Sequence, residues 1–223
     1  SKVIEYDMRE DTDLAWQLGL GCGGRVRILL QPISSENEYL HLDKLRQLLV
    51  SGKKAHYLQD KKAVLTENLL REEPFTKQDL KEYPTAFVSN HSPQITLAVF
   101  GGGVDARPVV NMANTMGWQT YLIDHRTSYA RDKYFPGCKQ IIREPASVLS
   151  GQDWLQRINA AVVMTHNIEQ DASALKILEN SSAQYVGLLG PTHRTDKVFN
   201  AANMSKRDYT CLLYTSPSPR DSR

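Results

Sequence analysis

Apolar and polar positions along the second half of the chain fall into blocks that predict alternating strands and helices. About five short apolar runs are typical of strands buried on both faces, at 95–100, 120–123, 139–143, 160–165 and 184–189. Between them, apolar residues recur every three or four positions, as on one face of a helix. This spacing predicts helices at 104–116, 145–155, 168–178 and 191–204. The order favours an α/β fold with a doubly wound parallel sheet.

The first part of the chain has a less regular pattern, which predicts a partial α+β domain. The predicted elements are strands at 2–6, 26–30, 55–58 and 63–66, the last two forming a hairpin joined through 59–62, and a helix at 40–49. Residues 72–93 are rich in charge and proline. We therefore predict an irregular connector there, between two domains.

The clearest motif is a glycine turn between the first apolar run of the second half and the helix after it. Gly101, Gly103 and Ala106 have the G-x-G-x-x-A spacing of dinucleotide-binding turns, and Asp124 follows about twenty residues later, where such folds place an acid for a ribose hydroxyl. The predicted domain is therefore Rossmann-like. Asp105 opposes a pyrophosphate at the helix start, because its carboxylate competes for the same amide groups. It is equally well explained as a helix cap.

Polar residues follow four of the predicted strands directly. Because the carboxyl ends of parallel strands share one edge, where open α/β sheets bind ligands, we expect these groups to line one site. Arginines there suit an anionic group, and a histidine suits acid–base or hydrogen-bonding roles. The candidate residues of this edge are Gly101, Gly103, Asp105, Asp124, His125, Arg126, Thr165, His166, Gly190 and Arg194.

A second glycine-rich stretch surrounds a cysteine near the beginning of the chain. Gly21 and Gly23 flank Cys22, and glycines at such positions let a ligand approach the backbone closely. A thiol with a lowered pKa would be a nucleophile or a soft metal ligand. The alternative is a tight turn with a small, inert, buried cysteine.

Composition excludes several classes of function. The formal net charge is only +2 over 223 residues, so neither nucleic acid nor a membrane surface is an expected partner. No run approaches the roughly 18 apolar residues of a membrane span, and no signal peptide is evident. The three cysteines have no metal-binding spacing and no even number for a disulfide framework. We expect a reducing, cytoplasmic location.

These patterns divide the chain into three parts. Residues 1–92 are predicted to hold the partial N-terminal domain and its connector, and residues 93–208 the Rossmann-like domain. Residues 209–223 are rich in Ser, Pro and Arg and break the α/β rhythm. They resemble translated sequencing-adapter read-through at the ends of assembled metagenomic genes, so we expect a non-native tail and exclude it from the predicted fold.

Six sequence blocks, in order along the chain, resemble the XdhC/CoxI family of accessory proteins for xanthine dehydrogenase and related molybdenum hydroxylases. The blocks are GLGCGG (19–24), GGGVDARPVV (101–110), GW-x-T-x-x-x-DHR-x-x-YA (117–130), FPGC (135–138), VVMTHNIEQD (162–171) and YVGLLGP-x-x-R (185–194). The family pattern has a further block before position 1 and a segment after the last helix. The resemblance therefore implies a fragment truncated at both ends.

The resemblance implies a chaperone that binds the molybdenum cofactor, molybdopterin, and assists its sulfuration and insertion. The implied partners are a cysteine desulfurase and a xanthine dehydrogenase-type enzyme, with a homodimer as a candidate assembly. Cys22 becomes a candidate contact to molybdenum or to the transferred sulfur. The implied role is that of a maturation factor more than a catalyst, and no catalytic residue is assigned. Two alternatives stay open: an NAD(P)-dependent oxidoreductase, favoured by the glycine turn, and an interaction module without a ligand.

Overall fold

The computed structural model of the chain describes residues 2–7, 24–62, 65–205 and 212–214. Contacts divide the chain into two compact units, Ser1–Pro93 and Gln94–Arg223, and each is described separately. Among the described residues, none of the helices has the length and apolar character needed to cross a membrane.

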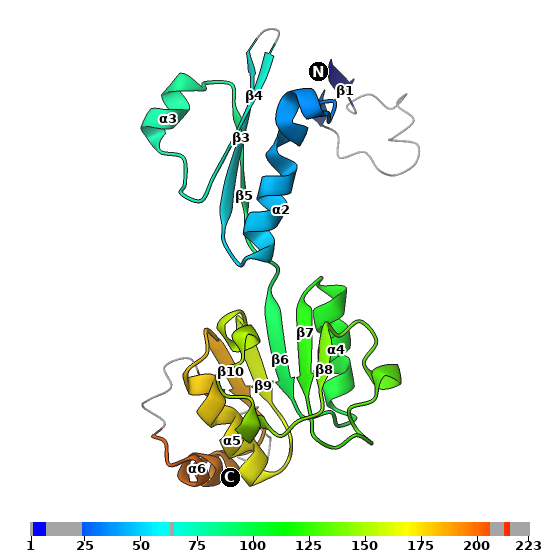
Figure 1. Ribbon diagram of the computed structural model, residues 1–223, viewed down its shortest axis with the longest axis vertical. Coiled ribbons are helices and arrows are strands. Elements are labelled where there is room, and N and C mark those ends of the chain that lie inside the picture. The colour runs from blue at the N-terminus through cyan, green and yellow to red at the C-terminus, as the bar shows by residue number, and fades with distance from the viewer. Residues whose placement is uncertain (1, 8–23, 63–64, 206–211, 215–223) are drawn as a thin grey trace. The chain divides into compact units, whose positions relative to one another are not determined.

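The second unit is built on a parallel sheet whose strands are ordered β11-β10-β9-β6-β7-β8 (Figure 1). The strands are β6 (Thr96–Phe100), β7 (Gln119–Ile123), β8 (Gln140–Ile142), β9 (Ala160–Val163), β10 (Tyr185–Leu188) and β11 (Leu212–Tyr214). The chain runs outward from β6 to β8, then returns past β6 to β9 and runs outward on the other side. The predicted doubly wound parallel sheet is confirmed, and its direction reverses between β6 and β9, where such sheets bind ligands.

Helices cover the two faces of this sheet (Figure 1). They are α4 (Ala106–Thr115), α5 (Ile168–Glu179) and α6 (Thr192–Ala202). Alternate residues of β6 face opposite sides, as in any strand. Leu97 and Val99 pack with α4 in one apolar core, whereas Ala98 and Phe100 pack with α5 and α6 in the other. Burial on both faces explains why the strands read as continuous apolar runs.

The helix after the glycine turn, α4, is set by spacing and by its last glycine. Ala106, Val110 and Ala113 lie on one face and are fully or almost fully buried. The helix ends where Gly117 takes a φ of +73°, a conformation that favours glycine. The amide of Trp118 then donates to the carbonyl of Ala113 at 2.9 Å, which closes the helix end. This fixes the distance between the glycine turn and β7.

The described part of the first unit contains two small antiparallel sheets. Its elements are β1 (Lys2–Asp7), β2 (Arg25–Leu30), a 3-10 segment η1 (Ser35–His41), α2 (Leu42–Val50), β3 (Ala55–Lys62), β4 (Leu65–Arg71), α3 (Lys77–Glu82) and β5 (Phe87–His91). β1 pairs with β2, and β3 pairs with both β4 and β5. Tyr57 on β3 is buried and donates its hydroxyl to the carbonyl of Leu40 at 2.7 Å. The predicted α+β character of this part is confirmed.

Three local predictions were wrong. The hairpin strands are longer than 55–58 and 63–66, because β3 continues to Lys62. Residues 72–93 are not irregular: Thr76 caps α3 through a hydrogen bond from the amide of Asp79, and β5 completes a sheet. The helix predicted at 145–155 is two 3-10 turns, η3 (Ala146–Val148) and η4 (Asp153–Gln156). Gly151, with a φ of +78°, separates them.

One strand lies in the stretch that the sequence analysis left out of the fold. The backbone of β11 pairs in parallel with β10 and adds a sixth strand to the sheet. The prediction that residues 209–223 are non-native stays a prediction.

Candidate functional site

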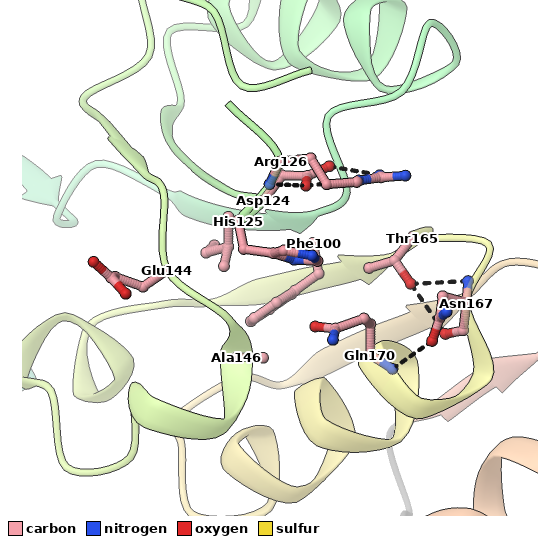
Figure 2. A pocket seen from close by; sticks show the side chains of 10 residues that line it. Phe100, Asp124, His125, Arg126, Glu144, Ala146, Thr165, Asn167 and Gln170 are labelled. Atoms are coloured by element: carbon pink, nitrogen blue, oxygen red, sulfur yellow. Dashed lines mark hydrogen bonds and ion pairs between the residues drawn. The ribbon is translucent and has the colours of Figure 1, made fainter. Parts of the chain in front are cut away.

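A pocket of about 160 Å³ opens at the carboxyl edge of the sheet (Figure 2). It lies beside the point where the strand order reverses, because its walls come from the ends of β6, β7 and β9 and from the first turn of α5. Its lining residues are Phe100, Ile123, Asp124, His125, Arg126, Glu144, Ala146, Thr165, Asn167 and Gln170. The pocket is smaller than the roughly 300 Å³ or more that encloses a whole drug-sized ligand. It therefore suits one part of a larger molecule.

The glycine turn packs tightly against the end of β9. Gly101 has a φ of +111°, and a Cβ there would lie 2.6 Å from the carbonyl oxygen of Met164. No other residue fits this position without moving β9. The next residues leave the backbone open: within the described residues, the amides of Gly103 and Val104 donate to no acceptor. Free amides at the start of a helix suit an anionic group.

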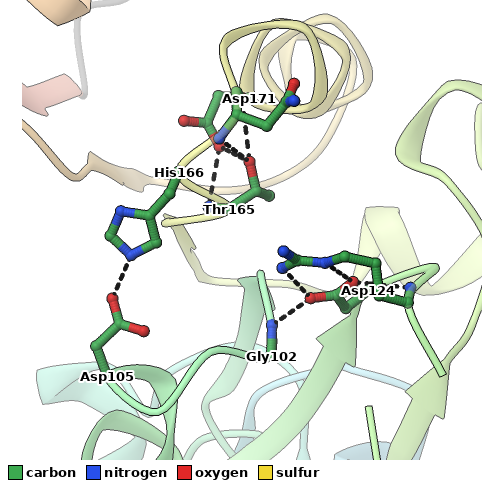
Figure 3. A network of polar contacts seen from close by, with 8 residues as sticks. Gly102, Asp105, Asp124, Thr165, His166 and Asp171 are labelled. Carbon is green, nitrogen blue, oxygen red and sulfur yellow. Dashed lines mark hydrogen bonds and ion pairs between the residues drawn. The ribbon is translucent and has the colours of Figure 1, made fainter. Parts of the chain in front are cut away.

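The acid after β7, Asp124, is already fully bonded (Figure 3). Its side chain is 2% exposed and accepts from the Gly102 amide at 2.7 Å. Arg126 donates to it through its amide at 2.9 Å, its Nε at 2.9 Å and its Nη2 at 2.7 Å. Burial raises the pKa of Asp124, but the hydrogen bonds from Arg126 and Gly102 outweigh it and hold the pKa below its usual value. The carboxylate is thus ionised and committed to the protein.

His166 and Asp105 face each other from two different loops (Figure 3). His166 lies after β9 with a φ of +63°, and its Nε2 is 2.6 Å from Oδ2 of Asp105. The two side chains remain 63% and 40% exposed. Asp105 occupies the N-cap position of α4 but makes no capping hydrogen bond, so the interpretation as a helix cap was wrong. Its charge is instead balanced by an exposed imidazole beside the glycine turn.

A buried network holds the loop that carries His166. Asp171 is completely buried on α5 and accepts from the Thr165 amide at 3.1 Å and from its hydroxyl at 2.5 Å. Arg194 on α6 donates to the other oxygen of Asp171 at 2.5 Å and to the carbonyl of Leu189 at 3.0 Å. Gly190, with a φ of +132°, lies against the Arg194 side chain. Arg194 therefore positions the loop and is not free for an external anion.

The structure brings only some of the predicted site residues into the pocket. Asp124, His125, Arg126 and Thr165 line it. The glycine turn, Asp105 and His166 lie at the same edge of the sheet, outside the lining. Gly190 and Arg194 support the neighbouring loop. Gly21, Cys22 and Gly23 lie outside the described residues, so the prediction that Cys22 faces this edge stays a prediction.

The sequence analysis missed several residues of the site. Asp171 is the most important, and one signal could have revealed it: it lies four positions before Leu175 and seven before Leu178, on the inward face of α5. A carboxylate at such a position is buried and therefore needs partners. The other missed residues are Phe100, Ile123, Glu144, Ala146, Asn167 and Gln170.

The donor set of this site fits the organic part of a phosphate-bearing cofactor. The described residues contain no group of three histidine, cysteine, aspartate or glutamate side chains that could hold a metal ion. The thiol at Cys138 is half-buried on the α4 side, and burial raises its pKa despite a hydrogen bond from Thr120. Within the described residues, this edge offers amides, a hydroxyl and an imidazole, which suit phosphate and ring nitrogens better than a metal.

The strand order and the glycine turn define a Rossmann-type domain. The family model of the XdhC Rossmann domain matches residues 97–211, which is more than half of the chain. The chain therefore belongs to the XdhC family, and the resemblance drawn from the sequence blocks is confirmed.

Two known proteins are similar over nearly the whole chain. A Bacillus subtilis protein, described as one of the probable subunits of xanthine dehydrogenase, is 30% identical over 234 residues, which are 94% of this chain and 69% of that protein. The crystal structure of a xanthine dehydrogenase from Bacillus halodurans matches with a TM-score of 0.71 and 22% identity, and covers 97% of this chain and 67% of that chain. At this identity the second likeness shows the fold.

Proposed function

We propose that this protein is an accessory factor of a xanthine dehydrogenase-type molybdenum enzyme. It binds the molybdenum cofactor, assists its sulfuration by a cysteine desulfurase and assists its insertion into the enzyme. The family and the name of the Bacillus subtilis relative support the link to xanthine dehydrogenase. A homodimer and a cytoplasmic location belong to the same proposal.

The observation that carries the proposal is the combination of free backbone donors and a small polar pocket at one edge. The free amides of Gly103 and Val104 suit the phosphate of the cofactor. The pocket near Thr165 and His125 has room for a ring system with nitrogen and oxygen atoms. His166, exposed beside the glycine turn, is a further hydrogen-bond donor for the ligand. These residues bind and orient the ligand; they break no bond.

The metal end of the cofactor is assigned to Cys22 on sequence grounds. A thiolate is a suitable ligand for a soft metal ion and a suitable carrier of sulfur. When bound, the molybdenum centre supplies the atom that receives the sulfur. The role of this chain in that step is to hold the cofactor and to keep water away from it.

Retention of the cofactor tests this proposal. The chain is purified from a host that makes molybdopterin, and the pterin is oxidised and measured by fluorescence. We expect near-stoichiometric pterin in the wild type and a several-fold loss in His166→Asn and in Cys22→Ala. His193→Asn is the matched control, because His193 is exposed on α6 and does not line the pocket. Absence of pterin from the wild type, or full retention in both test variants, contradicts the proposal.

The alternative function, an NAD(P)-dependent oxidoreductase, is favoured by the strand order and by the spacing of the glycine turn. One observation weighs against it: Asp124, at the position that would bind a ribose hydroxyl, has its carboxylate bonded to Gly102 and Arg126. Fluorescence titration with NADH and NADPH separates the two functions. Saturable binding below millimolar concentration would favour the oxidoreductase, and its absence excludes it.

A further inference from the structure

Three cations surround one aromatic ring next to the glycine turn. The ring belongs to Tyr134, in the 3-10 turn η2 (Asp132–Tyr134) of the segment between β7 and β8. The guanidinium carbon of Arg107 lies 3.8 Å from the ring centroid, Nζ of Lys133 lies 5.0 Å from it, and the guanidinium carbon of Arg131 lies 6.0 Å from it. We call these four residues the Tyr134 cluster.

The cations of the Tyr134 cluster have no acidic partner among the described residues. The acids nearest in sequence are committed elsewhere: Asp132 pairs with Arg143 at 2.6 Å, and Asp105 pairs with His166. The Nε of Arg107 is buried without an acceptor, so the stacked ring is its only partner in the described chain. Like charges gathered in this way repel one another, and a cation–π contact offsets only part of that repulsion. An anion is the missing component.

The place of the cluster indicates which anion. Arg107 lies in the first turn of α4, four residues after Gly103, which corresponds to about one helical turn or ~5–6 Å along the axis. The rest of the cluster belongs to the segment that begins with His125 and Arg126, two pocket-lining residues. The free amides and the cluster thus provide two anion-binding elements a short distance apart. A ligand with two linked phosphates fits both.

We propose that the Tyr134 cluster is a subsite for the second phosphate of a nucleotide-linked diphosphate. This rests on the proposed function, because it assigns to the phosphate-bearing cofactor a dinucleotide form, in which the first phosphate meets the glycine turn. Arg126 has no such role, because it is bound to Asp124. Arg107, held by the ring, and the exposed side chains of Arg131 and Lys133 close around the second phosphate.

Calorimetric titration with inorganic pyrophosphate and with cytidine diphosphate, at fixed ionic strength, tests the subsite. The test variant is Arg131→Gln with Lys133→Gln, because both side chains are exposed and their loss leaves the core intact. The matched control is Arg157→Gln with Lys176→Gln, which removes the same charge from exposed positions outside the cluster. We expect the test variant to bind both probes about tenfold more weakly than the wild type and the control. Arg107→Gln should have a similar effect.

Three results overturn the proposal. They are the absence of saturable pyrophosphate binding by the wild type, equal affinity in the test and control variants, and binding of pyrophosphate without binding of cytidine diphosphate. The last result would leave no room for a nucleoside. None of these readouts requires molybdopterin, so they are independent of the pterin assay that tests the proposed function.

Discussion

Substitution of Asp124 by Asn tests how the glycine turn is held in place. The two side chains have nearly the same shape, so the change removes charge and one acceptor oxygen but leaves no cavity. Asp124 accepts hydrogen bonds from the Gly102 amide and from three groups of Arg126. A hydrogen bond to a charged group is worth ~1.5–3 kcal/mol. At least two of the four are lost in the variant.

The net cost is smaller than a simple sum, because the Arg126 side chain is 37% exposed and water replaces part of what it loses. We expect Asp124→Asn to lower the free energy of unfolding by about 2–4 kcal/mol. Asp132→Asn is the control: that carboxylate is 85% exposed and also pairs with an arginine. Its loss should cost about 0.5 kcal/mol or less. Urea unfolding followed by tryptophan fluorescence measures both, since Trp118 and Trp154 lie in the second unit.

The pH dependence of this difference provides an independent check. The folded pKa of Asp124 lies below its usual value, so its contribution is fully present above the unfolded pKa of about 3.9. It is lost as the pH falls through the lower folded pKa. The gap between wild type and Asp124→Asn should therefore stay constant from neutral pH down to about pH 5 and close only at more acidic pH. A gap below about 0.5 kcal/mol at pH 7, or one that closes between pH 7 and 5, refutes the reasoning.

Three further predictions concern single residues. Gly101→Ala should lower the free energy of unfolding by more than about 2 kcal/mol, because its Cβ would meet Met164, whereas Gly117→Ala, with open space around it, should cost about 1 kcal/mol; similar urea midpoints would contradict this. The raised pKa of Cys138 predicts slower alkylation at pH 8 than for glutathione, measured by peptide mass spectrometry; an equal rate would be inconsistent with burial. His166→Asn should change stability by less than about 1 kcal/mol, because the histidine is exposed and asparagine tolerates its φ.

The strands of the second unit were predictable because both of their faces are buried. All five residues of β6 are buried, so the apolar run in the sequence marks the strand itself. The same reasoning failed where local sequence is ambiguous. β5 alternates only weakly between exposed and half-buried residues and depends on pairing with β3, about thirty residues earlier. Periodicity at 145–155 suggested one helix, but Gly151 interrupts it with a left-handed φ.

The edge of the site was predictable, but the partners of its charged residues were not. Strand ends fix where Asp124 and Thr165 lie, since parallel strands end on one side. The pairing of Asp105 with His166 joins residues 61 positions apart and depends on the conformation of two loops. The bond from Gly102 to Asp124 likewise depends on a side-chain direction that spacing does not encode. Spacing therefore located the candidates and misjudged which of them are free.

The charges at this edge are arranged so that the acids are neutralised and the backbone donors are left open. Asp124 pairs with Arg126, Asp171 with Arg194, and Asp105 with His166. Two of these acids are buried, so an incoming ligand does not compete for them. What remains for a ligand, among the residues that the structure describes, is the free amides of the glycine turn, the polar pocket and the unpaired cations of the Tyr134 cluster. Such a surface selects an anion through donors that need little rearrangement, and it disfavours a ligand that requires an accepting carboxylate for its ribose. That difference separates a phosphate-anchored cofactor carrier from a dehydrogenase built on the same fold.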